Sequence, residues 1–228
     1  MTEIWNGLVK AIELIVTLDP EVMEITGRSL AISVSACLLA SIVCLPLGSL
    51  IHFYRFTGKR TLINLIQTFY SIPTVAVGLF VFLLFSRAGP LGGLNLLFTP
   101  TVMVIGQMIL VVPLLLGLTI SALSGVDKVI PDTALSLGAS NWQAATLTLK
   151  EARFAVMAAV IMGFGRAISE VGLALMVGGN IRDVTRVFTT AISLETSKGD
   201  IELAIALGII LILIALIINI ALNRIQQR

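Results

Sequence analysis

Five stretches of this 228-residue chain are apolar over a length that could cross a lipid bilayer. A helix rises about 1.5 Å per residue, so roughly 20 residues span a hydrocarbon core of about 30 Å. Only 12% of the residues are charged, too few to cover the chain with polar surface in water. We therefore predict a single-domain, all-α integral membrane protein over residues 1–228. The predicted transmembrane helices are 30–51, 62–85, 101–123, 154–177 and 203–222.

The segment 1–27 precedes the first apolar stretch and carries a different pattern. Ile4, Leu8 and Ile12 recur at helical spacing, with Trp5 beside them and charged residues on the other faces. This pattern is typical of an amphipathic helix that lies at a membrane surface. Charged residues interrupt its apolar run, so the segment does not resemble a cleaved signal peptide.

The basic residues indicate an orientation in the membrane. Arg55, Lys59 and Arg60 form a tight cluster between the first two apolar stretches, and such clusters mark cytoplasmic loops. An odd number of spans puts the N-terminus outside and the C-terminus in the cytoplasm. The connection 124–153 is then cytoplasmic as well. The net charge of +2 gives no reason to expect a nucleic-acid partner.

The fourth stretch places Arg166, Ser169 and Glu170 near the middle of the bilayer, where ionisable side chains are costly. Arg166 and Glu170 are four residues apart, so they can pair on one face of a helix. Two roles stay open for them. The pair could fix helix register, or Arg166 could lend positive potential to an anion pathway while Glu170 holds it in place.

The other residues of this stretch separate into two helical faces. One face is small and suits close helix packing, whereas the opposite face is large and apolar and suits lipid. The small face comprises Ala155, Ala159, Gly163 and Ala167, and the large face comprises Met157, Ile161, Phe164, Ile168 and Leu175.

Prolines interrupt the first three stretches at Pro46, Pro73 and Pro113. A proline inside a helix removes a backbone donor and kinks or opens the helix, which membranes tolerate where the backbone is buried or lines a cavity. Around Pro73 the sequence adds several hydroxyl groups. A packing kink is the alternative to a pathway. The candidate pathway residues are Ser71, Pro73, Thr74, Arg166, Ser169 and Glu170.

The connection 124–153 is neither apolar enough to cross the membrane nor polar enough to be a flexible loop. Helix-favouring residues follow Pro131 up to Gly138, and a second helical stretch follows over 142–150. Gly138 is placed where a turn between two short helices would need it. The segment therefore suits the presentation of a surface.

In this connection Asp132-Thr133-Ala134 is followed, after three residues, by Gly138-Ala139-Ser140 and then Trp142. This motif resembles the EAA loop of permease subunits in binding-protein-dependent ABC importers. The resemblance implies a type I ABC importer permease fold with an ATPase-coupling helix that inserts into a groove on a separate ATP-binding subunit. Asp132 stands where that family has glutamate, Ala145 stands where it has an aromatic residue, and Lys150-Glu151 replaces a Leu-Pro ending. The coupling residues that the resemblance implies are Asp132, Ala134, Gly138, Ala139, Ser140 and Trp142.

The segments 164–172 and 178–181 are similar to permeases of tungstate and molybdate uptake systems. This resemblance implies import of an oxyanion by alternating access, driven by ATP. It also implies assembly as a homodimer with two ATP-binding subunits and an extracytoplasmic substrate-binding protein. ATP and Mg would then bind to the partner ATPase, and this chain would hold no cofactor and catalyse no reaction. The residues alone indicate only an anion, through Arg166, Arg182 and Arg186.

Several alternatives remain open from sequence. An importer for sulfate, phosphate or amino acids would share the same features. A proton-coupled secondary transporter would protonate Glu170 and bind substrate at Arg166. A membrane hydrolase would lack a base, because Ser169 has no histidine or lysine in its own stretch. No ATP site is predicted, since the segment 58–61 lacks the earlier glycine of a phosphate-binding loop. No metal site is predicted, since His52 stands without metal-binding partners.

Overall fold

The computed structural model describes residues 2–226, and within that range the chain forms helices and no strands. The predicted all-α class is confirmed. Two short 3-10 helices, η1 (Phe69–Ser71) and η2 (Gly92–Leu94), accompany the α-helices. The α-helices are α1 (Thr2–Val16), α2 (Pro20–Phe53), α3 (Lys59–Thr68), α4 (Thr74–Phe85), α5 (Pro100–Ser124), α6 (Val129–Ser136), α7 (Asn141–Glu151), α8 (Arg153–Ile168), α9 (Gly172–Gly178), α10 (Phe188–Lys198) and α11 (Ile201–Gln226).

Three helices, α2, α5 and α11, are long and apolar enough to cross a membrane. The count reaches five if α3–η1 with α4, and α8 with α9, are each taken as one span bent by 95° and 57°. The bend in 62–85 lies at Pro73, where the sequence predicts a kink or an opening, whereas the prediction of one continuous helix over 154–177 is wrong. In the first case Pro73 has no N–H to donate, and Ile72 before it adopts the extended backbone that a following proline favours.

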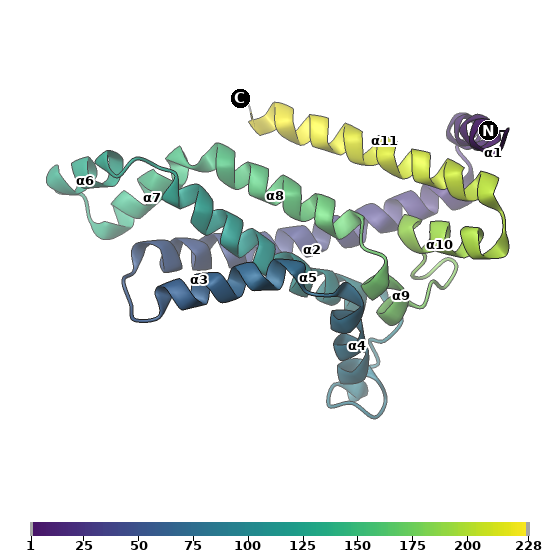
Figure 1. The fold of residues 1–228 in the computed structure, drawn as a ribbon, viewed down its shortest axis with the longest axis horizontal. Coiled ribbons are helices and arrows are strands. Elements are labelled where there is room, and N and C mark those ends of the chain that lie inside the picture. The colour runs from purple at the N-terminus through teal and green to yellow at the C-terminus, as the bar shows by residue number, and fades with distance from the viewer. Residues whose placement is uncertain (1, 227–228) are drawn as a thin grey trace.

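The other two prolines do not interrupt their helices. Pro46 lies inside α2 and Pro113 inside α5, and both helices continue past them. These two helices pack along each other and along α8 (Figure 1). Small residues such as Ala40 of α2 and Ala159 of α8 are buried in this contact, where they allow the helices to approach closely.

Helix α8 is covered on both of its long sides. Its small face packs on α5, as predicted, although Ala155 at the start of this face is exposed. The large face is only partly left to lipid, because Phe164 and Ile168 are buried against Cys37 of α2, with Leu211 of α11 beside them, whereas Leu175 is exposed. The predicted lipid-facing role of Phe164 and Ile168 is therefore wrong.

Helix α1 crosses the long helices at one end of the molecule. Figure 1 shows α1 end-on, whereas α2 and α11 run lengthwise. Its small residues Gly7 and Ala11 are buried on α11, and a Cβ added to Gly7 would lie 2.5 Å from Cγ2 of Ile205. Ile4 and Trp5 remain exposed on the other side. This arrangement leaves an apolar stripe free, but its position on a membrane surface stays a prediction.

The two ends of the molecule carry different elements. Helices α6 and α7 and the connection between α2 and α3 lie at one end, whereas α1 and α10 lie at the other (Figure 1). Arg55 in this connection and Arg60 at the start of α3 are therefore at the same end of the molecule as the α6–α7 hairpin, and the cytoplasmic location of this end stays a prediction. The sequence did not predict α10, which packs on α11.

Candidate functional site

The two bends in the bundle lie next to each other, although about a hundred residues separate them in the sequence. Helix α4 begins at Thr74 and α9 begins at Gly172. A Cβ added to Gly172 would lie 3.0 Å from Oγ1 of Thr74, and one added to Gly78 would lie 3.0 Å from Cα of Leu173. The two short helices thus run side by side from adjacent starts (Figure 1). The structure brings together the two segments that hold the candidate pathway residues.

Glu170 lies at the second bend, and its side chain is only 2% exposed. One carboxylate oxygen accepts a hydrogen bond from Arg166 Nη1 at 2.8 Å, and the other accepts from the backbone N of Leu173 at 2.9 Å. Its backbone carbonyl accepts from Oγ1 of Thr189 at 2.7 Å. The predicted pairing of Arg166 with Glu170 is confirmed, and Glu170 in addition connects α8, α9 and α10.

These bonds explain why α8 ends without a proline. A new helix leaves its first backbone N–H groups without partners, and a side-chain oxygen near its start can accept from one of them. Glu170 does this for α9, which was predicted to continue α8 as one helix. A glutamate followed two residues later by Gly172 was the available sequence signal, but inside an apolar stretch it is a weak one.

The candidate pathway residues at the bends differ in exposure. Ser71, Pro73 and Ser169 are exposed, Arg166 is partly buried, and Glu170 is buried. The accessible part of the ion pair is therefore its positive end, which attracts anions. The Ser169 hydroxyl is bonded to the carbonyls of Gly165 and Arg166, at 2.9 and 3.3 Å, so these contacts activate no nucleophile.

The α6–α7 hairpin has the helix, turn and helix that the sequence predicts. Gly138 forms the turn with a φ of +90°, a conformation that glycine adopts readily. Ser140 caps α7 through a reciprocal pair of bonds: its Oγ accepts from the Gln143 backbone N at 3.3 Å, and Gln143 Oε1 accepts from the Ser140 backbone N at 2.8 Å. Trp142, in the first turn of α7, is 80% exposed.

A shallow groove of about 480 Å³ lies beside Trp142 on the hairpin. Three of the predicted coupling residues, Ala134, Ala139 and Trp142, line it together. Asp132 and Ser140 are exposed outside the groove. An exposed tryptophan next to a groove is a typical anchor for a protein contact. The groove is completed by Gln143, Thr146, Leu147 and Lys150.

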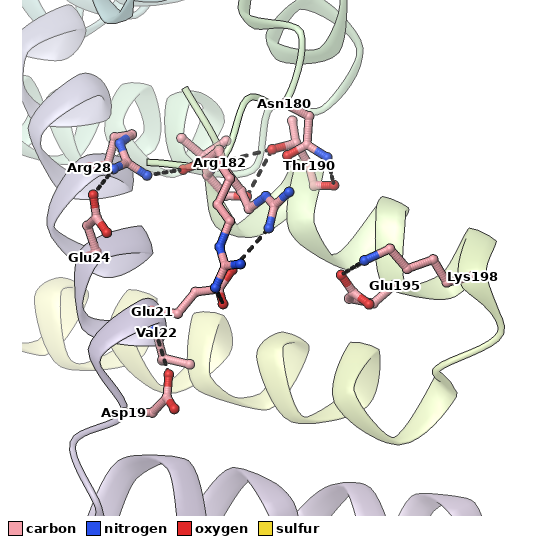
Figure 2. Close-up of polar contacts among 12 residues, drawn as sticks. Asp19, Glu21, Val22, Glu24, Arg28, Asn180, Arg182, Thr190, Glu195 and Lys198 are labelled. Carbon is pink, nitrogen blue, oxygen red and sulfur yellow. Dashed lines mark hydrogen bonds and ion pairs between the residues drawn. The ribbon is translucent and has the colours of Figure 1, made fainter. Parts of the chain in front are cut away.

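A second polar cluster, which the sequence did not predict as a unit, joins the start of α2 to the loop after α9 (Figure 2). Glu21 pairs with Arg182 at 2.6 Å and with Arg186 at 3.0 Å, and Arg28 donates to the Arg186 carbonyl at 3.0 Å. It was missed because α2 begins ten residues before the predicted 30. The signal was present, since Asp19 caps the helix and Pro20 occupies its first position.

Comparison with known proteins identifies the class of the molecule. The model of the family described as binding-protein-dependent transport system inner membrane component matches residues 44–228. The chain belongs to this family. It is thus a multi-pass membrane protein and the non-catalytic permease subunit of an ABC importer, which associates with a separate ATPase and a substrate-binding protein. The resemblance seen in the sequence is confirmed.

Individual relatives of this permease cover nearly its whole length. It is 40% identical to the tungstate uptake system permease protein TupB of Peptoclostridium acidaminophilum over 100% of both chains. It is 41% identical to a "probable anion ABC transporter permease protein" of Haloferax volcanii over 90% of this chain and 91% of the relative. The first of these relatives matches the whole chain and therefore all of the elements that carry the candidate site.

A solved structure confirms the fold. The permease is similar to a chain of a bacterial ABC transporter involved in the import of the acidic polysaccharide alginate, with a TM-score of 0.75. The match covers 95% of this chain and 83% of that chain, at 18% sequence identity. The predicted permease fold is confirmed by this likeness.

Proposed function

We propose that this permease carries tungstate, or the chemically similar molybdate, across the cytoplasmic membrane into the cell. The observation that carries the proposal is the 40% identity to a tungstate permease along the full length of both chains. The name of the Haloferax volcanii relative also refers to an anion. The accessible positive end of the Arg166–Glu170 pair suits such a substrate.

The pathway in this proposal runs past the two bends. Ser71 and Ser169 expose hydroxyl groups there, and the start of α4 at Thr74 lies beside them. Arg166 supplies positive potential, and Glu170 holds the arginine in place. Because these groups are exposed on one copy of the chain, we place the pathway between two copies in a homodimer.

Transport is driven by alternating access in this proposal. ATP, with Mg, binds to the partner ATPase, and the α6–α7 hairpin docks into that subunit with Trp142 as its anchor. Movement of the ATPase then favours either the outward-open or the inward-open permease, because the docked hairpin makes different contacts in the two states. The permease itself binds no cofactor.

The orientation follows from the basic residues. The end with Arg55, Arg60 and the hairpin faces the cytoplasm, where the ATPase is. The N-terminus and α1 then face outward, where the substrate-binding protein delivers the anion. The C-terminus lies on the cytoplasmic side.

Uptake of tungstate into reconstituted vesicles tests the proposal. The vesicles contain this permease, its ATPase and its binding protein, with or without internal ATP, and molybdate and sulfate are added as competitors. We expect uptake that requires ATP and that molybdate inhibits more strongly than sulfate. Uptake that ignores ATP and follows a proton gradient would instead support a secondary transporter. Stronger inhibition by sulfate would assign a different oxyanion.

A further inference from the structure

The polar cluster in Figure 2 holds a surplus of guanidinium donors. Two arginines, Arg182 and Arg186, converge on the single carboxylate of Glu21, each bonded to a different oxygen. That carboxylate carries one negative charge against two positive charges. Two guanidinium groups that share one carboxylate indicate that this site can hold an anion of higher charge than Glu21 provides.

The two arginines differ in how firmly they are held. Arg186 is only 14% exposed, and its backbone carbonyl accepts a hydrogen bond from Arg28, which also pairs with Glu24. Arg182 is 63% exposed and is held only by Glu21 among the residues that the structure describes. One guanidinium is therefore fixed in the site, and the other is free to adjust to what binds there.

The Glu21 carboxylate is the group that an anion can displace from the two arginines. Its side chain is 39% exposed, and exposed ion pairs contribute little to stability because water solvates both partners well. Glu21 belongs to the first turn of α2, where the helix N-terminus also favours its charge. A free carboxylate there would thus remain stable after losing its arginines.

We propose that Glu21, Arg182 and Arg186 form a transient binding site for a divalent tetrahedral oxyanion, which displaces Glu21 from the two arginines. Two oxygens of the anion take the donors on Arg182 and Arg186 that Glu21 uses. The charge of −2 matches the two guanidinium groups. This inference rests on the proposed function, because it supplies a first site for the imported anion outside the membrane, before it reaches Arg166.

The surrounding acids keep this site weak enough to release its anion. Glu24 neutralises Arg28, and Asp183 is exposed in the loop beside Arg182. With Glu21 included, three carboxylates offset three arginines in this region when no anion is bound. Transport requires a site that binds strongly enough to admit an ion and weakly enough to let it leave.

Equilibrium binding of sodium tungstate to the purified permease–ATPase complex tests the site, in lipid nanodiscs without nucleotide or binding protein. We expect saturable binding that Arg186→Gln weakens by about tenfold, since a charge-assisted bond is lost. Glu21→Gln should tighten binding severalfold, because it removes the competing carboxylate. Lys198→Gln is the matched control, since it removes an exposed cation that pairs with Glu195 outside the cluster, and it should change nothing.

The opposite signs of these effects separate a binding site from a structural ion pair. Loss of either partner of a structural pair would disturb the same loop, so weaker binding in both Arg186→Gln and Glu21→Gln would overturn the inference. If Arg186→Gln does not assemble, Arg182→Gln at the exposed arginine replaces it and should weaken binding severalfold.

The proposed function is checked separately in the same preparation. If the wild-type complex imports tungstate with ATP and binding protein but shows no saturable binding without them, this inference is wrong and the proposed function stands. If the wild-type complex does not import tungstate, the proposed function is wrong and the inference falls with it.

Discussion

The chain turns sharply at Gly138 in the α6–α7 hairpin and at Glu170 between α8 and α9, but the surroundings of the two turns are opposite. A Cβ added to Gly138 would meet no atom within 4 Å, and the neighbouring Trp142 is almost fully exposed. Glu170 is buried, and both of its carboxylate oxygens are bonded within the chain. The first turn is made by backbone conformation alone, the second by a side chain that replaces lost helix bonds.

This difference indicates that the two turns have different roles, one in binding a partner protein and the other in folding. A turn whose glycine and neighbouring tryptophan are exposed leaves its surface free for another protein, so substitutions there should affect assembly with the ATPase and spare folding. A turn whose charged side chain connects three helices fixes their packing, so substitutions there should affect folding first. Each of the following experiments tests this separation, and the expected effects on stability decrease from one to the next.

Arg166→Ala should have the largest effect on stability. It leaves the buried Glu170 carboxylate with the Leu173 N–H but without its positive partner. Removal of one partner of a buried ion pair costs about 3–5 kcal/mol, because the remaining charge is uncompensated. We expect a large drop in the yield of folded permease and in the thermal midpoint of the purified complex.

The double variant Arg166→Ala/Glu170→Gln is the control for this effect. Glutamine removes the charge but keeps an oxygen that can accept from the Leu173 N–H, so most of the stability should return. Tungstate uptake by the folded double variant then separates the two roles of the pair. Full uptake would make the pair purely structural, whereas a folded but inactive complex would support a role for Arg166 in the pathway. If Arg166→Ala alone were as stable as the wild-type permease, the buried turn would not fix the helix packing and the contrast between the two turns would be contradicted.

Gly117→Ala should have the next largest effect, because it acts at the other membrane bend. A Cβ at Gly117 of α5 would lie 1.6 Å from the hydroxyl oxygen of Tyr70, in η1 just before the bend at Pro73. Overpacking of this kind costs about 1–3 kcal/mol, which thermal unfolding of the complex would detect. Gly165→Ala is the matched control in α8, where an added Cβ meets no atom within 4 Å, and it should not destabilise the complex.

Gly138→Ala should have a smaller effect on stability, confined to the hairpin. An L-residue at a φ of +90° is strained, at a cost of about 1–2 kcal/mol. Because the hairpin makes few contacts with the bundle, we expect the thermal midpoint to change little and transport-coupled ATP hydrolysis to fall. Gly138→Asn should retain more coupling, since asparagine tolerates left-handed backbone better. Equal coupling in both variants would show that the turn geometry is unimportant.

The sequence predicts features that depend on nearby residues. The Gly138 turn is encoded by a glycine between two helix-favouring runs, and the Arg166–Glu170 pair is encoded by a spacing of four. In the same way, the lengths of the apolar stretches predicted α2, α5 and α11. The turn and the ion pair are determined within one or two helical turns, and each apolar stretch by the composition of a single helix, so no knowledge of the tertiary structure is needed.

Features that depend on distant residues could not be predicted in this way. Helical periodicity indicates that Phe164 and Ile168 share an apolar face, but lipid and a neighbouring helix are equally apolar, so the pattern cannot say which one covers that face. The Glu21–Arg182 ion pair joins residues 161 positions apart, in segments that lie outside the apolar stretches. Only the tertiary structure brings them together.

Trp142→Ala should have the smallest effect on stability and a large effect on transport. The side chain is 80% exposed, and exposed positions usually change stability by less than about 0.5 kcal/mol. If it anchors the ATPase, its removal should cost about 2 kcal/mol or more of binding, as expected at an interface hot spot. We expect a normal thermal midpoint for the isolated permease, weaker capture of the ATPase and lost ATP-dependent uptake.

Trp5→Ala, an equally large truncation of an exposed tryptophan in α1, is the matched control and should retain ATPase binding. If Trp142→Ala captured the ATPase normally, the hairpin would not dock the ATPase through this tryptophan, and the role inferred for the exposed turn would be wrong.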